Sequence, residues 1–169
     1  SQLNVVLNTQ EEQSEVMNIF ESKVHKCFNY KQIIEMKEYL EIKQLVSKGI
    51  AYHHSGVYHI FKEIIEMLMA HKNKDGKAQP LIKLLFATET FAIGINIPVK
   101  SISYTGLSKY SEQGFRYLHP HEFKQMSGRA GRRGMDKQGV AILLPNLYDL
   151  PQANEMKSIM SGHNQLIKS

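Results

Sequence analysis

The 169-residue sequence predicts an α/β fold in which a parallel sheet carries helices on both faces. Two continuous apolar runs, 83–88 and 139–144, are typical of strands that are buried on both faces. Segments with helical periodicity alternate with these runs, and buried strands that alternate with helices form parallel sheets. The hydrophobic fraction of 42% and the charged fraction of 22% are ordinary for a globular domain.

The composition also excludes several classes of protein. The chain is too apolar for a disordered tail, and its apolar runs fall far short of the ~20 residues that cross a bilayer, so no membrane partner is expected. We find no signal peptide at the N-terminus. The single cysteine, Cys27, forms no internal disulfide and fits a reducing intracellular compartment, nucleus or cytoplasm. The net charge of +5 permits an acidic partner such as nucleic acid.

Three helices and a strand are expected in the first half of the chain. The first helix covers residues 11–28, and the second covers about 31–46, with Asn29 as a candidate cap. The third lies within 57–68, where apolar side chains share one face. Between the second and third helices, the apolar run 50–52 predicts a short strand that ends in a loop.

The later elements are expected in the following order. They are a polar loop at 71–80, a buried strand at 83–88, a turn or short helix over 88–98, a strand at 101–105, a mixed loop at 106–120, a helix over 121–133, a buried strand at 139–144 and a last helix near 151–160. Three loops, 53–56, 88–90 and 94–96, each follow a predicted strand. Because ligands bind at the carboxyl ends of parallel strands, these loops are expected to share one functional edge.

Arginine is rare in this chain and concentrated in one place. There are 17 lysines but only 4 arginines, and three of these, Arg129, Arg132 and Arg133, fall within five residues. Arginine carries a planar fork of donors that suits phosphate, which lysine lacks. The functional site is therefore sought first at this cluster.

A helix over 121–133 would divide this segment into two faces. Gln125, Arg129 and Arg132 would fall on the polar face, with the two arginines one turn apart, opposite an apolar face. Gly128 and Gly131 would flank the polar face and let another molecule come close. Two arginines in this arrangement suit the spread charge of a transferring phosphoryl group. The alternative interpretation is a solvated basic face on which the glycines only end the helix.

Three segments resemble motifs of one protein family. QMSGRAGRRG at 125–134 resembles motif VI of the superfamily 2 DExH-box helicases, ATETFAIGINIP at 87–98 resembles motif V, and GIAYHHSG at 49–56 resembles motif IVa. All three belong to the second RecA-like domain of that family. The Met135-Asp136 pair that follows GRAGRRG is similar to RNA helicases of the superkiller and exosome-cofactor type.

The resemblance implies a domain division and a function. It implies a boundary segment at 1–10, a RecA-like domain at 11–150, in which we do not find the motif IV strand, and a C-terminal helix and tail at 151–169. The expected function is the C-terminal motor domain of an ATP-dependent RNA helicase that acts on single-stranded RNA, within an RNA-processing complex. A DNA helicase of the same superfamily and a catalytically silent nucleic-acid-binding module are the alternatives.

The resemblance also implies roles for single residues. Arg129 and Arg132 would contact the ATP phosphates, one of them as an arginine finger, and Gln125 would help to hold the site together. The nucleotide would also contact Gly94, Asn96 and Gly128. The residues expected along the nucleic-acid strand are His53, His54, Ser55, Gly56, Thr88, Glu89 and Thr90.

The sequence contains no phosphate-binding loop with its lysine and no DExH box. The resemblance therefore implies that a first RecA-like domain of the same protein holds the Mg²⁺ ion and most of the ATP. We expect that this segment alone neither hydrolyses ATP nor unwinds RNA. No metal is expected at the histidines near residue 54, because no cysteine or carboxylate lies at ligand spacing.

Two features stay open at the level of sequence. The aromatic residues Tyr104, Tyr110, Phe115 and Tyr117 suit either base stacking or packing in the core and loops. The lysine-rich loop within 71–80 is longer than is usual in the family, so it is interpreted as an insertion. It suits either solvation or contact with RNA.

Overall fold

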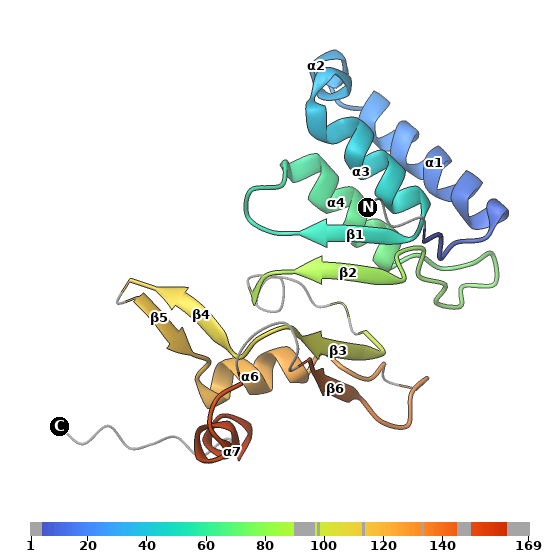
Figure 1. Ribbon diagram of the computed structural model, residues 1–169. Helices are drawn as coiled ribbons and strands as arrows, with labels where there is room; N and C mark the ends of the chain where they lie inside the picture. The colour runs from blue at the N-terminus through green and yellow to red at the C-terminus, as the bar shows by residue number, and fades with distance from the viewer. Residues whose placement is uncertain are drawn as a thin grey trace. The chain divides into compact units, whose positions relative to one another are not determined.

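The computed structural model describes residues 5–89, 97, 99–112, 114–132, 134–144 and 150–161. The chain divides into two compact units, unit 1 (Ser1–Phe91) and unit 2 (Ala92–Ser169), shown in Figure 1. The expected single domain over 11–150 stays a prediction. No helix in the described ranges is long and apolar enough to span a membrane.

Residues 5–89 of unit 1 form four helices and two strands (Figure 1). They are α1 (Gln10–His25), α2 (Tyr30–Glu35), α3 (Lys37–Ser47), β1 (Ile50–His53), α4 (His59–Met69) and β2 (Leu84–Ala87). The two strands pair in parallel, with Ile50 opposite Leu84 and His53 opposite Ala87. A parallel pair needs a crossover connection, which α4 provides. Between residues 5 and 49 no strand precedes β1, so the described chain contains no motif IV strand.

Helices contact both faces of β1, because successive side chains of a strand point to opposite sides. Ala51 and His53 are buried, and His53 hydrogen-bonds Glu66 of α4. Tyr52 points to the other face, where burial and the acidic Glu41 and Glu38 of α3 raise the pKa of its hydroxyl. Unit 1 thus confirms the expected α/β arrangement of parallel strands between helices.

The core of unit 1 lies where α1, α3 and α4 meet. Phe20 of α1 is fully buried, and its ring centroid lies 5.6 Å from that of Tyr39 and 6.1 Å from that of Phe61. Helix α1 begins at a reciprocal cap, in which Glu12 N–H donates to the Thr9 hydroxyl and Thr9 N–H donates to the Glu12 carboxylate. The first and third predicted helices are therefore confirmed.

The second predicted helix is wrong as a single element. Met36 has an extended backbone (φ −66°, ψ 137°) that separates α2 from α3. In an unbroken helix Ile33 would lie on roughly the opposite face from Ile42 and Val46. The break lets all three side chains enter the core, where each is at most 2% exposed.

In its described residues unit 2 contains two strand pairs and two helices (Figure 1). The elements are β3 (Ser101–Tyr104), β4 (Ser108–Ser111), β5 (Gly114–Tyr117), α6 (Pro120–Ser127), β6 (Val140–Leu143) and α7 (Ala153–Ser161). Strands β3 and β6 are parallel, whereas β4 and β5 form an antiparallel hairpin. The expected mixed loop at 106–120 is therefore wrong, because polar and aromatic residues on either side of Gly114 pair as strands.

The two strands predicted to be buried on both faces are in fact exposed. In β2, Leu84 is 43% and Phe86 is 59% exposed, and in β6, Val140 is 49% and Ile142 is 43% exposed. Within the described ranges β2 pairs with β1 alone and β6 with β3 alone. An apolar run shows that a strand suits burial, but whether other segments cover it depends on the tertiary structure.

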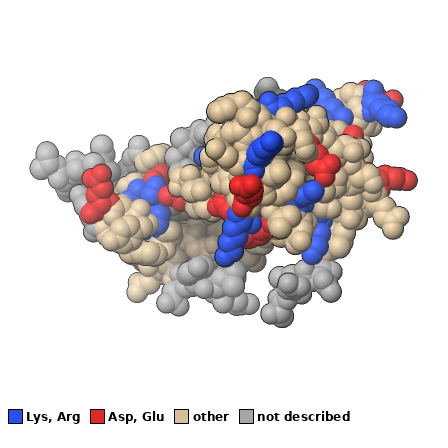
Figure 2. All heavy atoms as spheres, turned by 90° about the horizontal axis from the view of Figure 1, so that it is seen from above, with Lys and Arg blue, Asp and Glu red and all other residues tan. Residues whose placement is uncertain are grey.

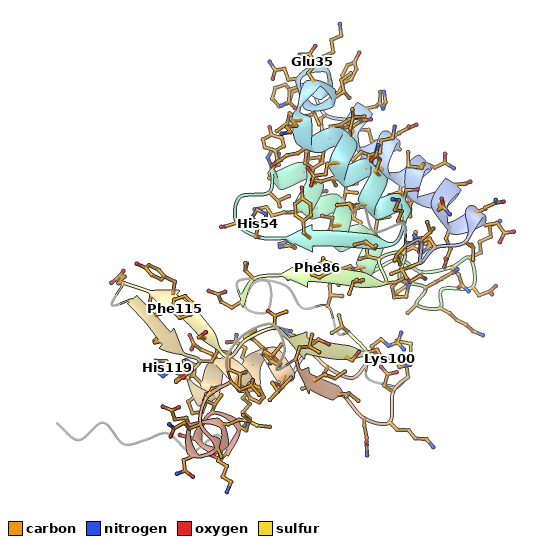
Figure 3. The ribbon with its side chains drawn as sticks, viewed as in Figure 1. Glu35, His54, Phe86, Lys100, Phe115 and His119 are labelled. Carbon is orange, nitrogen blue, oxygen red and sulfur yellow. The ribbon has the colours of Figure 1, made fainter. Side chains whose placement is uncertain are left out.

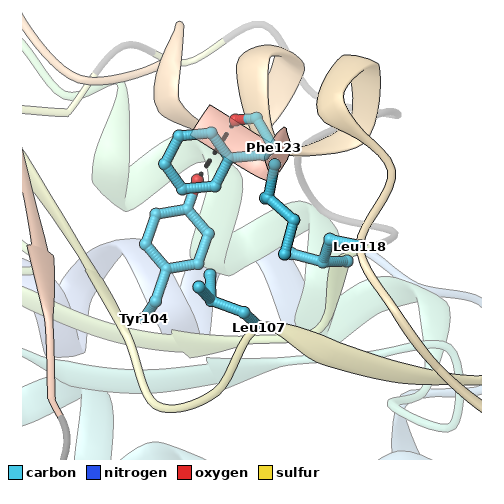
Figure 4. Packing of buried hydrophobic residues seen from close by; sticks show 5 residues of the cluster. Tyr104, Leu107, Leu118 and Phe123 are labelled. Atoms are coloured by element: carbon cyan, nitrogen blue, oxygen red, sulfur yellow. Dashed lines mark hydrogen bonds between the residues drawn. The ribbon is translucent and has the colours of Figure 1, made fainter. Parts of the chain in front are cut away.

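The core of unit 2 holds α6 against β3 and α7. Tyr104, Leu107, Leu118, Phe123 and Ile159 form the buried cluster shown in part in Figure 4. The Tyr104 hydroxyl donates to the carbonyl oxygen of Phe123 and lies 2.8 Å from the Ser127 hydroxyl. Burial raises the pKa of the Tyr104 hydroxyl above its ordinary value. Tyr104 is thus a core residue, and packing in the core is the correct interpretation for this member of the aromatic group.

An ion-pair cluster joins the hairpin to α6. Glu122 forms a two-point pair with the guanidinium of Arg116, at 2.8 Å for each contact, and a third contact with Lys109 at 3.2 Å. Its carboxylate also accepts the backbone N–H of His119, which precedes the helix. The Arg116 pair is the largest cause of a pKa of Glu122 far below the ordinary value of 4.5.

We expect Glu122→Gln to lower the free energy of unfolding by about 1–3 kcal/mol at neutral pH, because it leaves these cations without their carboxylate. The depressed pKa means that this stability is complete above pH 4.5 and is lost as the pH falls toward the folded-state pKa. Urea unfolding at several pH values should therefore show the difference shrinking in acid. The control is Glu112→Gln in the hairpin turn, and a difference that does not depend on pH would contradict the assignment.

Candidate nucleotide and nucleic-acid site

Two of the predicted loops meet at one edge of unit 1. The parallel register places His53 opposite Ala87, and the backbone N–H of Thr88 donates to the His53 carbonyl at 3.3 Å. The loop 54–56 and the residues Thr88 and Glu89 therefore leave the same edge of the sheet. This confirms the shared edge for these two segments. Thr90, Gly94 and Asn96 lie outside the described residues, as does Arg133.

The side chain of His53 points into unit 1 and not toward this edge. It is 8% exposed, and its Nε2 atom lies 3.1 Å from the Glu66 carboxylate of α4. A direct contact between this side chain and a nucleic acid, which the resemblance implies, does not fit its burial. The alternation of strand side chains is the cause, since His53 is the last residue of β1 and faces α4.

The next three residues present polar groups to solvent. His54, Ser55 and Gly56 are all exposed, and Figure 3 shows His54 just beyond the end of β1. The backbone N–H of Gly56 donates to Nδ1 of His54 at 3.1 Å, and the His54 ring stacks on Tyr52 with centroids 5.7 Å apart. The loop therefore holds the imidazole of His54 in one orientation at the edge.

In unit 2, helix α6 separates an apolar face from a polar face as predicted. Phe123 is 8% exposed, and Met126 packs against the same core cluster. Gln125 lies on the exposed side, and so does Gly128, which ends the helix.

The expected helix over 121–133 is wrong beyond Ser127. Helix α6 ends there, and the chain then pairs with Val99, whose N–H donates to the Arg129 carbonyl at 2.9 Å. The N–H of Gly131 donates back to Val99 at 2.7 Å. Arg129 and Arg132 are therefore presented by a turn and an extended segment after the helix, and not by consecutive helical turns.

The backbone conformation at residue 131 and a close contact within the chain both require a glycine at this position. Its φ of +92° is a conformation that only glycine adopts readily, and a Cβ here would lie 3.0 Å from the Cα of Gly139. A Cβ on Gly139 would in turn overlap the Ala130 carbonyl. We predicted that Gly131 lets another molecule come close. In the structure the close neighbour of Gly131 is instead the backbone of Gly139, directly before β6.

Arg132 is held by a carboxylate four residues later. Its Nε donates to Asp136 Oδ2 at 2.8 Å and its Nη2 donates to Oδ1 at 3.0 Å. The Arg132 pair is the largest cause that lowers the pKa of Asp136 to about 2. Arg129 and Arg132 are both half-buried. The roles of Arg129, Arg132, Gln125 and Gly128 at ATP stay predictions.

Sequence reasoning named three aromatic residues as either stacking or packing side chains but missed the hairpin that exposes them. Tyr110 is 77% exposed, Phe115 is 74% exposed and Tyr117 is 43% exposed, all on the β4–β5 hairpin. The rings of Tyr110 and Phe115 meet edge to face with centroids 6.3 Å apart, and Figure 3 labels Phe115 on the hairpin. The pattern that could have predicted the hairpin is the pair of short runs SKYS and GFRY, separated by two residues, with Gly114 at the start of the second run.

Unit 1 carries surface charges of both signs. Figure 2 shows the face above α1–α3, where lysines and acidic residues are interspersed and form no broad basic surface. Two of these lysines form ion pairs at 2.8 Å, Lys43 with Glu21 and Lys23 with Glu63. Among the residues that the structure describes, no cluster of histidine, cysteine or acidic side chains could hold a metal ion.

Comparisons with known proteins identify relatives of this chain. None of the protein-family models compared with the sequence matches it. The chain is 41% identical over 165 residues to the DExH-box ATP-dependent RNA helicase DExH9 of Arabidopsis thaliana. This match covers 98% of the chain and 16% of that protein. It is 39% identical over 164 residues to the ATP-dependent RNA helicase mtr4 of Schizosaccharomyces pombe, covering 96% of the chain and 14% of that protein.

A third relative is the Superkiller complex protein 2 of Homo sapiens, at 38% identity over 135 residues, which are 80% of the chain and 10% of that protein. The chain thus spans 10–16% of the length of these three relatives. The identities extend over most of the chain. Over most of its length the chain is therefore similar to a short segment of the DExH-box RNA helicases of the superkiller and exosome-cofactor type.

Proposed function

We propose that this chain is the second RecA-like motor domain of an ATP-dependent RNA helicase, where it supplies arginines to the ATP site and part of the grip on single-stranded RNA. The observation that carries the proposal is the end of α6 together with the segment that follows it. Gln125 in the last turn of α6 is exposed, and beyond the helix the Arg132 guanidinium is held in one orientation. Two relatives named as RNA helicases support RNA over DNA. No observation favours a non-catalytic module.

The arginine segment suits the phosphates of ATP. A guanidinium spreads its charge over a planar fork, and the phosphoryl group spreads its negative charge over several oxygens as it transfers. Arg129 and Arg132 would stabilise that charge, Gln125 would hydrogen-bond at the same site, and Gly128 would leave room beside them. Mg²⁺ would be held by a first RecA-like domain of the same protein, since the sequence given contains no DExH box.

The shared edge of unit 1 suits the backbone of RNA. The Ser55 hydroxyl and the His54 imidazole are exposed at the end of β1, and Thr88 follows β2 at the same edge. Hydroxyl groups and backbone N–H groups contact phosphate and sugar without reading sequence. These residues would therefore hold a strand of any sequence, and Glu89 with its neighbours would couple that grip to the nucleotide.

The hairpin would add a stacking contact. Tyr110, Phe115 and Tyr117 are exposed aromatics, and a base can stack on such a ring regardless of its identity. Lys109 precedes Tyr110 and Arg116 lies between Phe115 and Tyr117, and the ion pairs with Glu122 fix these two cationic residues to α6. The hairpin is thus a firmly anchored aromatic surface.

The proposed partners are single-stranded RNA, a first RecA-like domain of the same protein and an RNA-processing complex. One relative is named as a superkiller complex protein, which supports a complex as the setting. An intracellular location is part of the same proposal, and it rests on the lone Cys27, which forms no disulfide.

Arg132→Lys in the full-length helicase tests the arginine role. We expect the RNA-stimulated ATPase rate to fall ~10³–10⁵-fold, the loss seen when an arginine finger is removed. The affinity for single-stranded RNA should stay within about twofold, because the lysine keeps the charge. Steady-state ATPase assays and RNA-binding titrations measure both quantities. Near-normal turnover would remove Arg132 from the ATP site.

Phe115→Ala tests the stacking surface. Loss of one stacked base costs about 1–3 kcal/mol, so the affinity for single-stranded RNA should fall about 5- to 150-fold at constant salt. The control is Phe28→Ala, which removes a 100% exposed ring from unit 1. Fluorescence anisotropy with a labelled RNA measures both variants. Equal affinities for the two variants would show that the hairpin does not contact RNA.

A further inference from the structure

The contact between Arg132 and Asp136 uses one particular edge of the guanidinium. Nε and Nη2 donate to the two carboxylate oxygens at 2.8 Å and 3.0 Å. An arginine has five N–H donors, and this side-on contact uses two of them. Within the described part of the chain, Nη1 makes no hydrogen bond, so the end of the guanidinium, formed by Nη1 and Nη2, still has donors available.

The carboxylate is itself fixed by the backbone around it. Asp136 Oδ2 also accepts the backbone N–H of Arg132 at 2.8 Å. In the other direction, the N–H groups of Met135 and Asp136 donate to the Arg132 carbonyl at 3.0 Å and 2.9 Å. The side chain of Asp136 is 10% exposed and that of Arg132 is 26% exposed. Residues 132–136 therefore form a closed turn with the guanidinium as one of its parts.

We propose that Asp136 is a positioning residue for Arg132: it holds the side-on edge of the guanidinium so that the Nη1–Nη2 end is presented to a nucleotide phosphate. This inference rests on the proposed function, in which Arg132 contacts ATP. A flexible arginine would lose side-chain entropy at the moment of contact, whereas a side chain already held in place has lost most of it in the free protein. An acidic neighbour at this position would thus favour the rate of phosphoryl transfer.

Two other roles for the pair fit the geometry less well. A purely stabilising role fits less well, because all three hydrogen bonds to Asp136 come from Arg132, four residues earlier, and a pair at that spacing closes one local turn and contributes little to the stability of the whole. Sequestration of the arginine would need acceptors at both edges of the guanidinium, and Asp136 occupies one. Lys100 also acts on the carboxylate and helps to lower its pKa, so the local charge is not negative.

The test is Asp136→Asn in the full-length helicase, with Asp75→Asn as the matched control in the exposed loop of unit 1. The amide of asparagine offers one acceptor and two donors, so the two-point contact is lost while the volume is kept. We expect kcat for RNA-stimulated ATP hydrolysis to fall about 10- to 100-fold, as when a supporting partner of a catalytic side chain is removed. The KM for ATP, the RNA affinity and Tm should change little. Asp136→Ala should behave in the same way.

A double-mutant cycle separates this inference from the proposed function. If Asp136 acts through Arg132, then adding Asp136→Asn to Arg132→Lys should lower kcat no further, whereas independent effects would multiply. An unchanged kcat in Asp136→Asn, or a parallel loss of RNA affinity and Tm in both Asp136 variants, would overturn the positioning role. Neither result would touch the proposed function, which would fail instead if Arg132→Lys alone kept normal turnover.

Discussion

The close approach of two backbone segments at Gly131 and Gly139 determines the geometry of the arginine site. A Cβ at Gly131 would lie 3.0 Å from the Cα of Gly139, and the neighbouring residues pair with Val99 through two backbone hydrogen bonds. These contacts are incompatible with a continuing helix, so α6 ends at Ser127. The turn that begins at Arg132 follows directly, and with it the position of the guanidinium. A rigid backbone therefore carries the arginine, although the residue lies in a loop.

A second constraint acts in unit 1 in the same manner. Parallel pairing of β1 with β2 requires that both strands end on the same side, and the register places the end of each opposite the other. Residues more than thirty positions apart in sequence, such as Ser55 and Thr88, thereby leave one edge of the sheet. In each unit, backbone hydrogen bonds hold the polar side chains of loops near fixed positions, which is how rigid scaffolds present functional loops.

Sequence patterns predicted the elements that depend on local periodicity. The helices α1 and α4, the strands β1, β2, β3 and β6, and the common edge of the 53–56 and 88–89 segments all follow from apolar spacing and from the geometry of parallel sheets. The family resemblance rested on three short motifs in order, and the homologues agree with it. These features could be inferred because each depends on residues that are close in sequence or on a rule of topology.

The features that sequence missed depend on tertiary contacts. The end of α6 is decided by Gly139 and Val99, which are distant along the chain from Ser127. The burial of His53 is decided by Glu66 of α4, and the two-point partner of Arg132 was visible only as an acidic residue in a motif. The hairpin was missed because its strands are only four residues long and expose their aromatic side chains, so no apolar run marks them in the sequence.

The exposed strands β2 and β6 have a practical consequence for work with this segment alone. Each pairs along a single edge within the described chain, and Phe86 and Ile142 present apolar surface beside that edge. Unpaired strand edges with apolar flanks are templates to which strands of other molecules add. Concentrated preparations of the isolated segment would therefore self-associate by strand addition, and its soluble handling calls for dilute samples or for charged substitutions along these two strands.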